Sequence, residues 1–232
     1  MTKARTPRFY FSLRSPYSWL AYRRLLAEYP DIAELVEWVP FWEPDERSAA
    51  ALTGTFPYSA MSRAKHLYIL QDVSRLARQA AVPLAWPVDR APVWEIPHLA
   101  YLVAERAGLG REYVAATYRT RWEQGRDICD RAIVAEIAAS IGVDPDAAAS
   151  AADDPDLRAD GCAILERICR DGVFGVPFFV NGFNRYWGVE RLADFAAELR
   201  ARLVPATGLP AIRAGTVGLG RSSDEGHVGG CG

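Results

Sequence analysis

The spacing of apolar and polar positions predicts a strand, a helix and a second strand at the start of the chain. Residues 8–13 form a short apolar run that predicts a strand, and apolar positions recur at helical spacing from Trp19 to Leu26. The helix is expected to end near Pro30, and alternation over residues 35–41 predicts the second strand. A helix joining two strands over about 40 residues is typical of a parallel crossover unit.

The middle of the chain is predicted to be mostly helical. Residues 47–58 are interpreted as a loop because they contain Thr53-Gly54 and Phe56-Pro57. Apolar spacing then predicts helices over residues 59–80, 97–107, 111–124, 131–141 and 154–169, with a further helix opened by Asp144 and Pro145.

A hairpin and a helix are predicted for the last ordered part of the chain. Residues 172–180 are predicted to form a strand entered through Pro177, with Asn181-Gly182 as a two-residue turn and residues 185–187 as the return strand. A helix is expected from Val189 to around Leu203.

Together these elements predict an α/β fold in which one mixed sheet is interrupted by an all-helical insertion. The crossover unit supplies two parallel strands, and the hairpin adds two antiparallel ones. The expected division is residues 1–48 for the first half of the sheet domain, 49–170 for the helical insertion, 171–204 for the second half and 205–232 for a Gly- and Ser-rich disordered tail.

Composition narrows the partners that the chain is expected to have. Half of the 232 residues are hydrophobic, and 27 basic residues stand against 29 acidic ones. This balance gives no electrostatic argument for nucleic acid or a membrane surface as a partner. No run reaches the roughly 20 apolar residues of a membrane span, and the polar start has no signal region, so a cytoplasmic protein is expected.

The four cysteines are predicted to be reduced thiols that bind no metal. Cys129, Cys162, Cys169 and Cys231 form no Cys-x-x-Cys pair and have no zinc-ligand spacing with histidine. Cys162 and Cys169 are about two helical turns apart, roughly 10 Å, which is too far for a disulfide. The first three are interpreted as small buried hydrophobic residues.

The junction between the first strand and the first helix carries candidate chemistry in the segment Ser15-Pro16-Tyr17-Ser18. Ser15 is a good helix cap, and Pro16 suits the first helical position. The free amides and partial positive charge of a helix N-terminus favour an anion such as a thiolate. Dithiol oxidoreductases hold Cys-x-x-Cys at this position. Here Ser15 and Ser18 supply two hydroxyls, which can donate hydrogen bonds but cannot exchange disulfides. The alternative is that Ser15 only caps the helix.

Two further segments carry candidate binding groups. A cis bond between Val176 and Pro177 would expose the Val176 backbone to a peptide-like ligand, whereas a trans bond would make a plain turn. The segment Trp187-Gly188-Val189-Glu190 opens the predicted last helix, where free amides suit a carboxylate and Glu190 suits an ammonium group. Alternatively, Glu190 only complements the helix dipole.

In this order the segments resemble the kappa-class glutathione transferase and 2-hydroxychromene-2-carboxylate isomerase family, within the DsbA-like thioredoxin group. The resemblance spans residues 8 to about 203 and implies a thioredoxin-like sheet with a DsbA-like helical insertion. It is carried by Phe9-Tyr10, the segment from Ser15 to Leu20, Lys65, Leu67, Tyr68, Asp72, the segment from Gly172 to Pro177, and the segment from Trp187 to Leu192.

The resemblance implies that Ser15 holds the sulfur of glutathione or of a similar low-molecular-weight thiol. It implies that the Val176 backbone pairs with the cysteinyl unit, that Val189 and Glu190 receive the γ-glutamyl end, and that Lys65 reaches the glycyl carboxylate. The other thiol-binding positions that it implies are the neighbours in the same motifs: Pro16, Tyr17, Pro177, Trp187 and Gly188.

The family also implies a homodimer and an aromatic-lined acceptor site under the helical block. Trp42, Trp86 and Trp94 are candidates for lining that site, and their alternative is an ordinary place in the core. Two departures affect ligand contacts. Residues 52–57 lack the asparagine usual in the family, and Val189 replaces a polar residue, which removes a hydrogen bond of about 1 kcal/mol.

The leading functional hypothesis is a thiol-dependent isomerase that acts on an unsaturated aromatic or polyketide-like substrate through reversible thiol addition. The alternative enzyme is a kappa-like transferase that conjugates the thiol to an electrophile. A non-catalytic protein that binds a thiol or a partner is the third hypothesis. A dithiol oxidoreductase is disfavoured because serines occupy both positions of the Cys-x-x-Cys motif.

Overall fold

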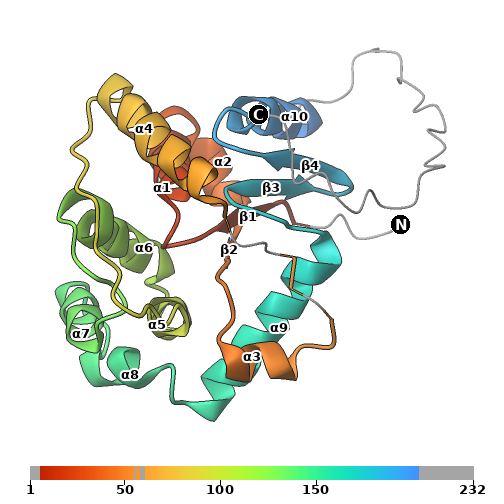
Figure 1. Cartoon of the computed structure of the whole chain (residues 1–232). Coiled ribbons are helices and arrows are strands. Elements are labelled where there is room, and N and C mark those ends of the chain that lie inside the picture. Colours follow the sequence, from red (N-terminus) through yellow and green to blue (C-terminus); the bar gives the residue numbers. More distant parts are fainter. Residues whose placement is uncertain (1–5, 55, 58–60, 204–232) are drawn as a thin grey trace.

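The structure is a computed structural model that describes residues 6–54, 56–57 and 61–203. Its centre is a four-stranded sheet with the order β2-β1-β3-β4 (Figure 1). The strands are β1 (Arg8–Phe11), β2 (Glu37–Pro40), β3 (Phe178–Asn181) and β4 (Asn184–Trp187). β1 is parallel to β2, and β3 is antiparallel to both β1 and β4. The predicted mixed sheet is confirmed.

Two helices, rather than one, join β1 to β2. Ser15 caps α1 (Pro16–Glu28) and Pro16 opens it, as the sequence predicts. α1 stops at Tyr29 because Pro30 has no amide hydrogen for the next intrahelical bond, and the chain restarts as α2 (Pro30–Leu35). The second strand is therefore shorter than the predicted residues 35–41.

A block of helices separates β2 from β3. It contains α3 (Glu46–Ala51), α4 (Arg63–Gln79), α5 (Glu95–Arg106), α6 (Gly110–Tyr118), the π-helical turn η1 (Arg119–Glu123), α7 (Arg131–Ser140), α8 (Pro145–Ser150) and α9 (Pro155–Asp171). The prediction that residues 47–58 form a loop is wrong for α3. The Asp45 carboxylate accepts the Ser48 amide at 2.7 Å and caps the alanine-rich segment that follows.

The end of the sheet domain differs from the prediction in three places. β3 starts at Phe178, because the preceding proline has no amide hydrogen for the ladder. Asn181 pairs with Asn184, so the turn lies one residue further along, with Gly182 at φ +62° in its first position. α10 (Leu192–Leu203) begins three residues after Val189, because the chain first turns at Gly188.

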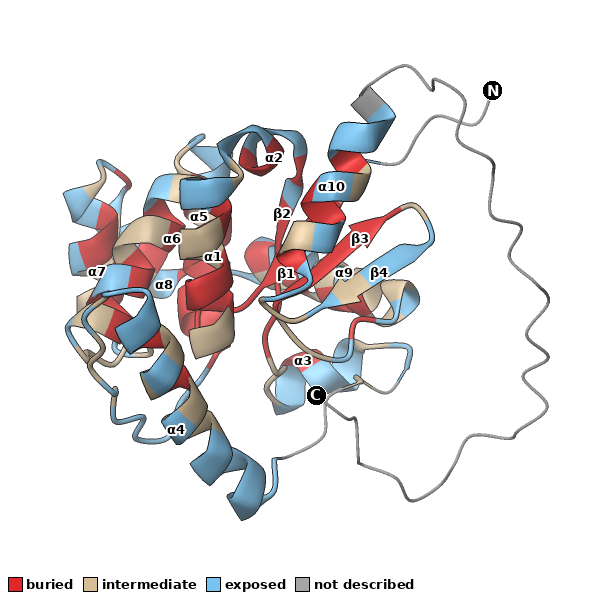
Figure 2. Cartoon of the chain, turned by 90° about the horizontal axis from the view of Figure 1, so that it is seen from above, coloured by how far each residue is buried: buried red, intermediate tan, exposed pale blue. Residues whose placement is uncertain are grey.

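Aromatic side chains join the sheet to its covering helices. Phe9 of β1 stacks on Phe179 of β3 at 5.0 Å, and Phe179 contacts Phe195 of α10 at 5.1 Å. Figure 2 shows buried residues along β1 and β3, whereas the first half of α4 is exposed. In that half Leu67 and Tyr68 are 50% and 55% exposed. The core therefore buries residues 18–21 of α1 and leaves the start of α4 at the surface.

Cys129, Cys162 and Cys169 are free thiols, as predicted, but they are half-buried rather than fully buried. Cys162 and Cys169 lie beside the buried stripe of α9 rather than within it. Cys231 and the predicted tail lie outside the described residues.

The described part of the chain contains no helix that is both long and apolar enough to cross a membrane. Within that same part, no three or more His, Cys, Asp or Glu side chains gather as a metal site would require.

Candidate active site

The turn between β1 and α1 is built from hydrogen-bonded serines. The Ser15 amide donates to the Ser12 carbonyl at 3.1 Å, and the Ser15 Oγ accepts the Ser18 amide at 3.2 Å. The Ser18 Oγ accepts the Ser12 amide at 3.2 Å. Ser18 is fully buried, whereas Ser15 is half-buried. Ser18 therefore supports the turn, and Ser15 is the serine with access to a ligand.

The capping bond leaves the Ser15 hydroxyl able to act on a second partner. A hydroxyl has one donor hydrogen and two acceptor lone pairs, and the Ser18 amide uses only a lone pair. Pro16, the first residue of α1, contributes no amide hydrogen. The partial positive charge of the helix N-terminus adds to the attraction for an anion. Ser15 can thus donate a hydrogen bond to an anion at this end of α1.

Two buried residues that the sequence reasoning missed support this turn from the helical block. The Leu13 amide donates to Nε2 of His98 at 3.1 Å, and the Tyr118 hydroxyl donates to the Ser12 carbonyl at 3.1 Å. His98 belongs to α5, and Tyr118 is the last residue of α6. No local pattern could have identified them, because they meet the turn only in the folded chain.

Pro177 lies at the same end of the sheet as the start of α1. The Val176–Pro177 peptide bond is cis, as predicted. Tyr10 pairs with Phe178 in the antiparallel register of β1 and β3. The residue before Phe178 therefore lies beside the carboxyl end of β1, from which the chain turns into α1. Val176, which precedes Pro177 in the chain and is half-buried, lies next to it at this edge.

The segment after β4 folds over the cis-proline. The Gly188 amide donates to the Pro177 carbonyl at 3.0 Å. The rings of Trp187 and Phe174 lie 5.0 Å apart, and a Cβ on Gly175 would lie 3.1 Å from Nε1 of Trp187. The motifs predicted from residues 172–177 and 187–190 therefore meet in the structure.

Tyr17 connects α1 with α4 and with the segment after β4. Its hydroxyl donates to Oδ2 of Asp72 at 2.7 Å. Burial raises the pKa of Tyr17 above its ordinary value, and the Asp72 hydrogen bond and the Glu190 carboxylate add to the effect. The Val189 carbonyl accepts a hydrogen bond from Arg24 of α1 at 3.4 Å. Tyr17 is thus a neutral phenol held between these three elements.

Lys65 lies nearer the N-terminus of α4 than Asp72, the hydrogen-bond partner of Tyr17. It is exposed in the first turn of that helix, and its amide donates to the Ser62 cap at 3.2 Å. Asp72 follows seven residues later, about 10 Å along the helix axis. The structure therefore places Glu190 near enough to raise the pKa of Tyr17, while Lys65 is exposed about two helical turns from Asp72.

The three candidate tryptophans have different degrees of exposure. Trp42 is buried and stacks on the His98 imidazole at 5.4 Å. Trp94 is buried, with the guanidinium groups of Arg14 and Arg121 at 5.2 and 5.1 Å from its ring. Trp86 is 37% exposed. Of the three, Trp86 is the most exposed.

A buried cation lies within this aromatic region. The Arg121 side chain is 2% exposed and makes two hydrogen bonds of 2.8 Å to the carboxylate of Asp89. The same guanidinium lies 4.8 Å from the ring of Trp122, whose ring contacts that of Trp86 at 5.9 Å. The carboxylate neutralises Arg121, so this cluster is a structural support for the tryptophans.

The fold and the site define a thioredoxin-like protein with serine hydroxyls at the N-terminus of α1 and a cis-proline before β3. The family model of the DSBA-like thioredoxin domain matches residues 8–200, and the chain belongs to this family. It is similar to 2-hydroxychromene-2-carboxylate isomerase from Sphingobium xenophagum, with 30% identity over 200 residues. The match covers 84% of this chain and 96% of that relative.

Solved structures agree on the fold. A structure of 2-hydroxychromene-2-carboxylate isomerase matches with a TM-score of 0.66 and 21% identity, and covers 85% of this chain and 95% of the other. The cytosolic disulfide reductase DsbM from Pseudomonas aeruginosa matches with a TM-score of 0.60 and 21% identity, and covers 86% and 98%. DsbM in a structure with GSH matches with a TM-score of 0.58. The DsbA-like thioredoxin fold expected from the sequence is confirmed.

Proposed function

We propose that the chain is an isomerase that uses glutathione or a similar low-molecular-weight thiol. The observation that carries the proposal is the Ser15 hydroxyl at the N-terminus of α1. Its lone pair is used by the Ser18 amide at 3.2 Å, so its hydrogen is available to a thiolate. The 30% identity to 2-hydroxychromene-2-carboxylate isomerase supports isomerisation as the reaction.

The rest of the thiol would extend along the edge formed by the two motifs. The Val176 backbone, beside the cis-Pro177, would pair with the cysteinyl unit as an added strand. Glu190 would attract the γ-glutamyl ammonium group, with Val189 and Gly188 beside it, and the exposed Lys65 would attract the glycyl carboxylate. The same fold accommodates GSH in the structure of DsbM, which supports a thiol of this size.

The chemistry would be a reversible addition. The thiolate sulfur forms a bond to an electron-poor carbon of an unsaturated substrate, and the electron pair of the double bond moves onto the conjugated carbonyl. The former double bond is now single and can rotate. Return of the electron pair expels the thiolate and restores the double bond in the other geometry, so no thiol is consumed. Ser15 would stabilise the thiolate before addition and after its release.

The substrate class follows from the aromatic residues and from the relative. The Sphingobium protein is a 2-hydroxychromene-2-carboxylate isomerase by name, so an unsaturated aromatic or polyketide-like substrate is proposed. Trp86 would provide the accessible wall of the acceptor site. Trp94 and Trp42 would form the buried layer behind it.

Conjugation of the thiol to an electrophile is the second candidate, because it shares the addition step and differs only in that the adduct is released. Binding of a thiol or a partner without catalysis is the third, and the Val189 departure from the family pattern favours it.

A cytoplasmic homodimer also belongs to the proposal, by family resemblance. Sedimentation of the purified chain at micromolar concentration should show twice the 25.6 kDa monomer mass.

The test is a paired measurement of binding and turnover. Glutathione, cysteine and a thioether analogue of glutathione are titrated by calorimetry, and 2-hydroxychromene-2-carboxylate isomerisation is followed by absorbance with and without each thiol. Saturable thiol binding and thiol-dependent isomerisation are expected. Accumulation of a conjugate would favour the transferase, and binding without turnover on a panel of such substrates would favour the non-catalytic alternative.

A further inference from the structure

A buried imidazole lies behind the turn that presents Ser15. His98 is fully buried in the first turn of α5. Its Nε2 is 3.1 Å from the Leu13 amide, and its Nδ1 is 2.7 Å from the Trp94 carbonyl. An amide can only donate and a carbonyl can only accept, so Nδ1 carries the hydrogen and Nε2 offers its lone pair.

The imidazole stays neutral at working pH. Burial, together with the cationic Arg121 and Arg14, lowers the pKa of His98 to about 3. The Trp42 ring stacks on the imidazole at 5.4 Å with an angle of 21° between the planes. His98 therefore has one protonation state, one tautomer and one ring orientation.

The contacts of His98 lead to Ser15 through the backbone of the turn. The imidazole fixes the Leu13 amide, and the preceding Ser12 carbonyl accepts the Ser15 amide at 3.1 Å. The Ser12 Oγ also lies 3.5 Å from Nε2 of His98. Two residues of the turn before Ser15 are thus held against α5.

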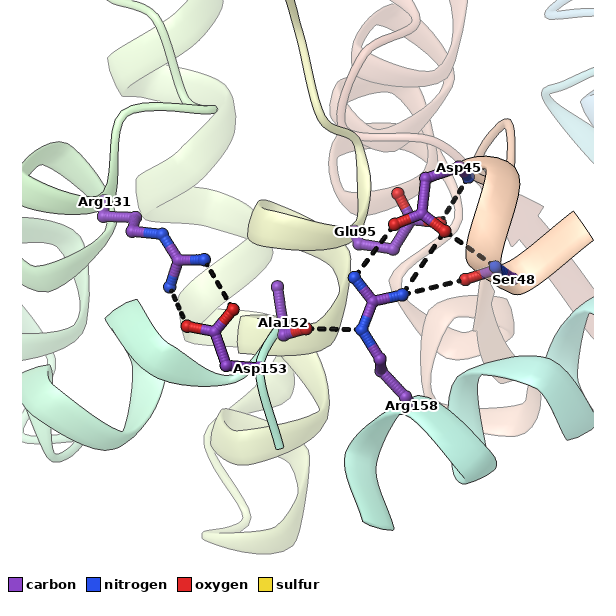
Figure 3. Close-up of polar contacts among 7 residues, drawn as sticks. All are labelled: Asp45, Ser48, Glu95, Arg131, Ala152, Asp153 and Arg158. Atoms are coloured by element: carbon purple, nitrogen blue, oxygen red, sulfur yellow. Dashed lines mark hydrogen bonds and ion pairs between the residues drawn. The ribbon is translucent and has the colours of Figure 1, made fainter. Parts of the chain in front are cut away.

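The start of α5 is itself anchored to other helices. Glu95, the residue after Trp94, accepts the Asp45 amide through Oε1 at 2.7 Å. The Asp45 carboxylate pairs with Arg158 of α9 at 2.9 Å (Figure 3). The Trp94 carbonyl that holds Nδ1 of His98 therefore belongs to a helix end fixed to both α3 and α9.

We infer that His98 is a positioning residue for Ser15: its two hydrogen bonds set the place of the β1–α1 turn and hence of the Ser15 hydroxyl relative to a bound thiol. Misplacement of a reacting group by about 1 Å can cost on the order of a hundredfold in rate, so a small shift of the turn matters. The inference rests on the proposed role of Ser15. Its geometric part can be tested without any enzyme activity.

The test introduces a reporter at the site. In a Ser15→Cys chain, the helix N-terminus should hold the pKa of the introduced thiol below its ordinary value of about 8.5. The pKa is measured from the pH dependence of alkylation, with mass spectrometry to separate this thiol from the native cysteines. The measurement is repeated with His98→Leu, which fills similar space without hydrogen bonds, and with His98→Gln, which can accept the Leu13 amide.

His98→Leu should raise the pKa of the introduced thiol by about one unit or more. With His98→Gln, the pKa should return most of the way to its value in the Ser15→Cys chain. Tyr101→Phe is the matched control. Tyr101 is equally buried on α5, where its hydroxyl donates to Glu105 at 3.1 Å, and its loss should leave the thiol pKa unchanged. A thiol pKa that is equal in all four chains would overturn the inference while leaving the proposed isomerase intact.

A second variant and a second measurement keep the inference testable if His98→Leu does not fold. His98→Met, with a flexible side chain that also lacks both hydrogen bonds, then replaces it. In the unaltered chain, amide hydrogen exchange of Leu13 should be as slow as that of the core strands. Fast exchange of this amide would overturn the inference regardless of the variants.

Discussion

Replacing Ser15 by alanine gives the most direct test of the proposed chemistry. Within the residues that the structure describes, the hydroxyl makes one hydrogen bond, from the Ser18 amide at 3.2 Å. Its loss should cost the folded state about 1 kcal/mol as a missing helix cap. In the reaction the same change removes a charge-assisted hydrogen bond to the thiolate, worth about 1.5–3 kcal/mol. The rate should therefore fall roughly tenfold to somewhat over a hundredfold.

The assay is thiol-dependent isomerisation measured from pH 6 to pH 10, together with thermal melting at each pH. The defect of Ser15→Ala should be largest at low pH, where the enzyme must favour the thiolate over the thiol. It should diminish above the pKa of the free thiol, where thiolate is abundant without help. Most of the loss in rate should appear in the dependence of the rate on thiol concentration, because the hydroxyl acts on the thiol and not on the acceptor.

A cap lost elsewhere separates stability from chemistry. Asp130 caps α7 by accepting the Ala132 amide at 2.8 Å, and it is exposed. Asp130→Ala should lower the melting temperature about as much as Ser15→Ala and leave the rate unchanged. Equal rates for Ser15→Ala and the parent chain at neutral pH would refute the reasoning, since the hydroxyl would then be only a cap.

Three further outcomes are expected. The purified protein should neither reduce insulin disulfides nor oxidise a reduced test protein, because Ser15 and Ser18 contain no sulfur; turnover in either assay would contradict the site assignment. The pKa of His98 is lowered to about 3 in the folded chain, so the unfolded chain binds the proton first as the pH drops below 6.5. The free energy of unfolding should therefore fall by about 1.4 kcal/mol per pH unit between pH 6.5 and pH 3. Denaturant titrations of His98→Gln should show a shallower dependence of this free energy on pH. Asp89→Ala should destabilise the chain by about 3 kcal/mol or more in chemical denaturation, because it leaves Arg121 buried without a counter-charge; a loss below 1 kcal/mol would contradict this.

The start of the fold was predictable because its signals are local. Ser15 as a cap and Pro16 at the first helical position define the start of α1 from adjacent residues alone. The same holds for the alternation that predicts β2. The resemblance to the family added the order of the later motifs, which periodicity could not relate to one another.

The errors arose where a strong local turn signal was overridden, once by another local signal and once by a tertiary contact. In residues 47–58 the glycine and proline signals outweighed the Asp45 cap and the alanines after it, so α3 was missed. At the hairpin, Asn181-Gly182 is a strong turn dipeptide, but the Asn181 amide group donates to Glu198 of α10 at 3.0 Å. That tertiary contact keeps Asn181 in the strand and moves the turn to the next residue.

The support of the site was not predictable, because it depends on contacts between distant parts of the chain. His98 and Tyr118 look like ordinary members of helices in the sequence, yet both bind the turn before Ser15. In the folded chain both residues are buried among mostly apolar neighbours, so in the sequence nothing sets them apart from core positions. Only the folded chain distinguishes a polar group that supports a site from one that fills a core.

In the proposed chemistry, the groups that hydrogen-bond to the turn before Ser15 would act on a thiolate as dipoles rather than as charges. The groups that bond to the turn are neutral: the Ser18 hydroxyl, the Tyr118 phenol and the uncharged imidazole of His98. The neighbouring Arg14 guanidinium is paired with the Glu43 carboxylate, so the proposed attraction for an anion rests mainly on oriented dipoles, namely the helix N-terminus and the Ser15 O–H. Dipoles stabilise a charge only while they point at it, so the proposed chemistry requires that the turn be held in place, as the His98 and Tyr118 hydrogen bonds hold it.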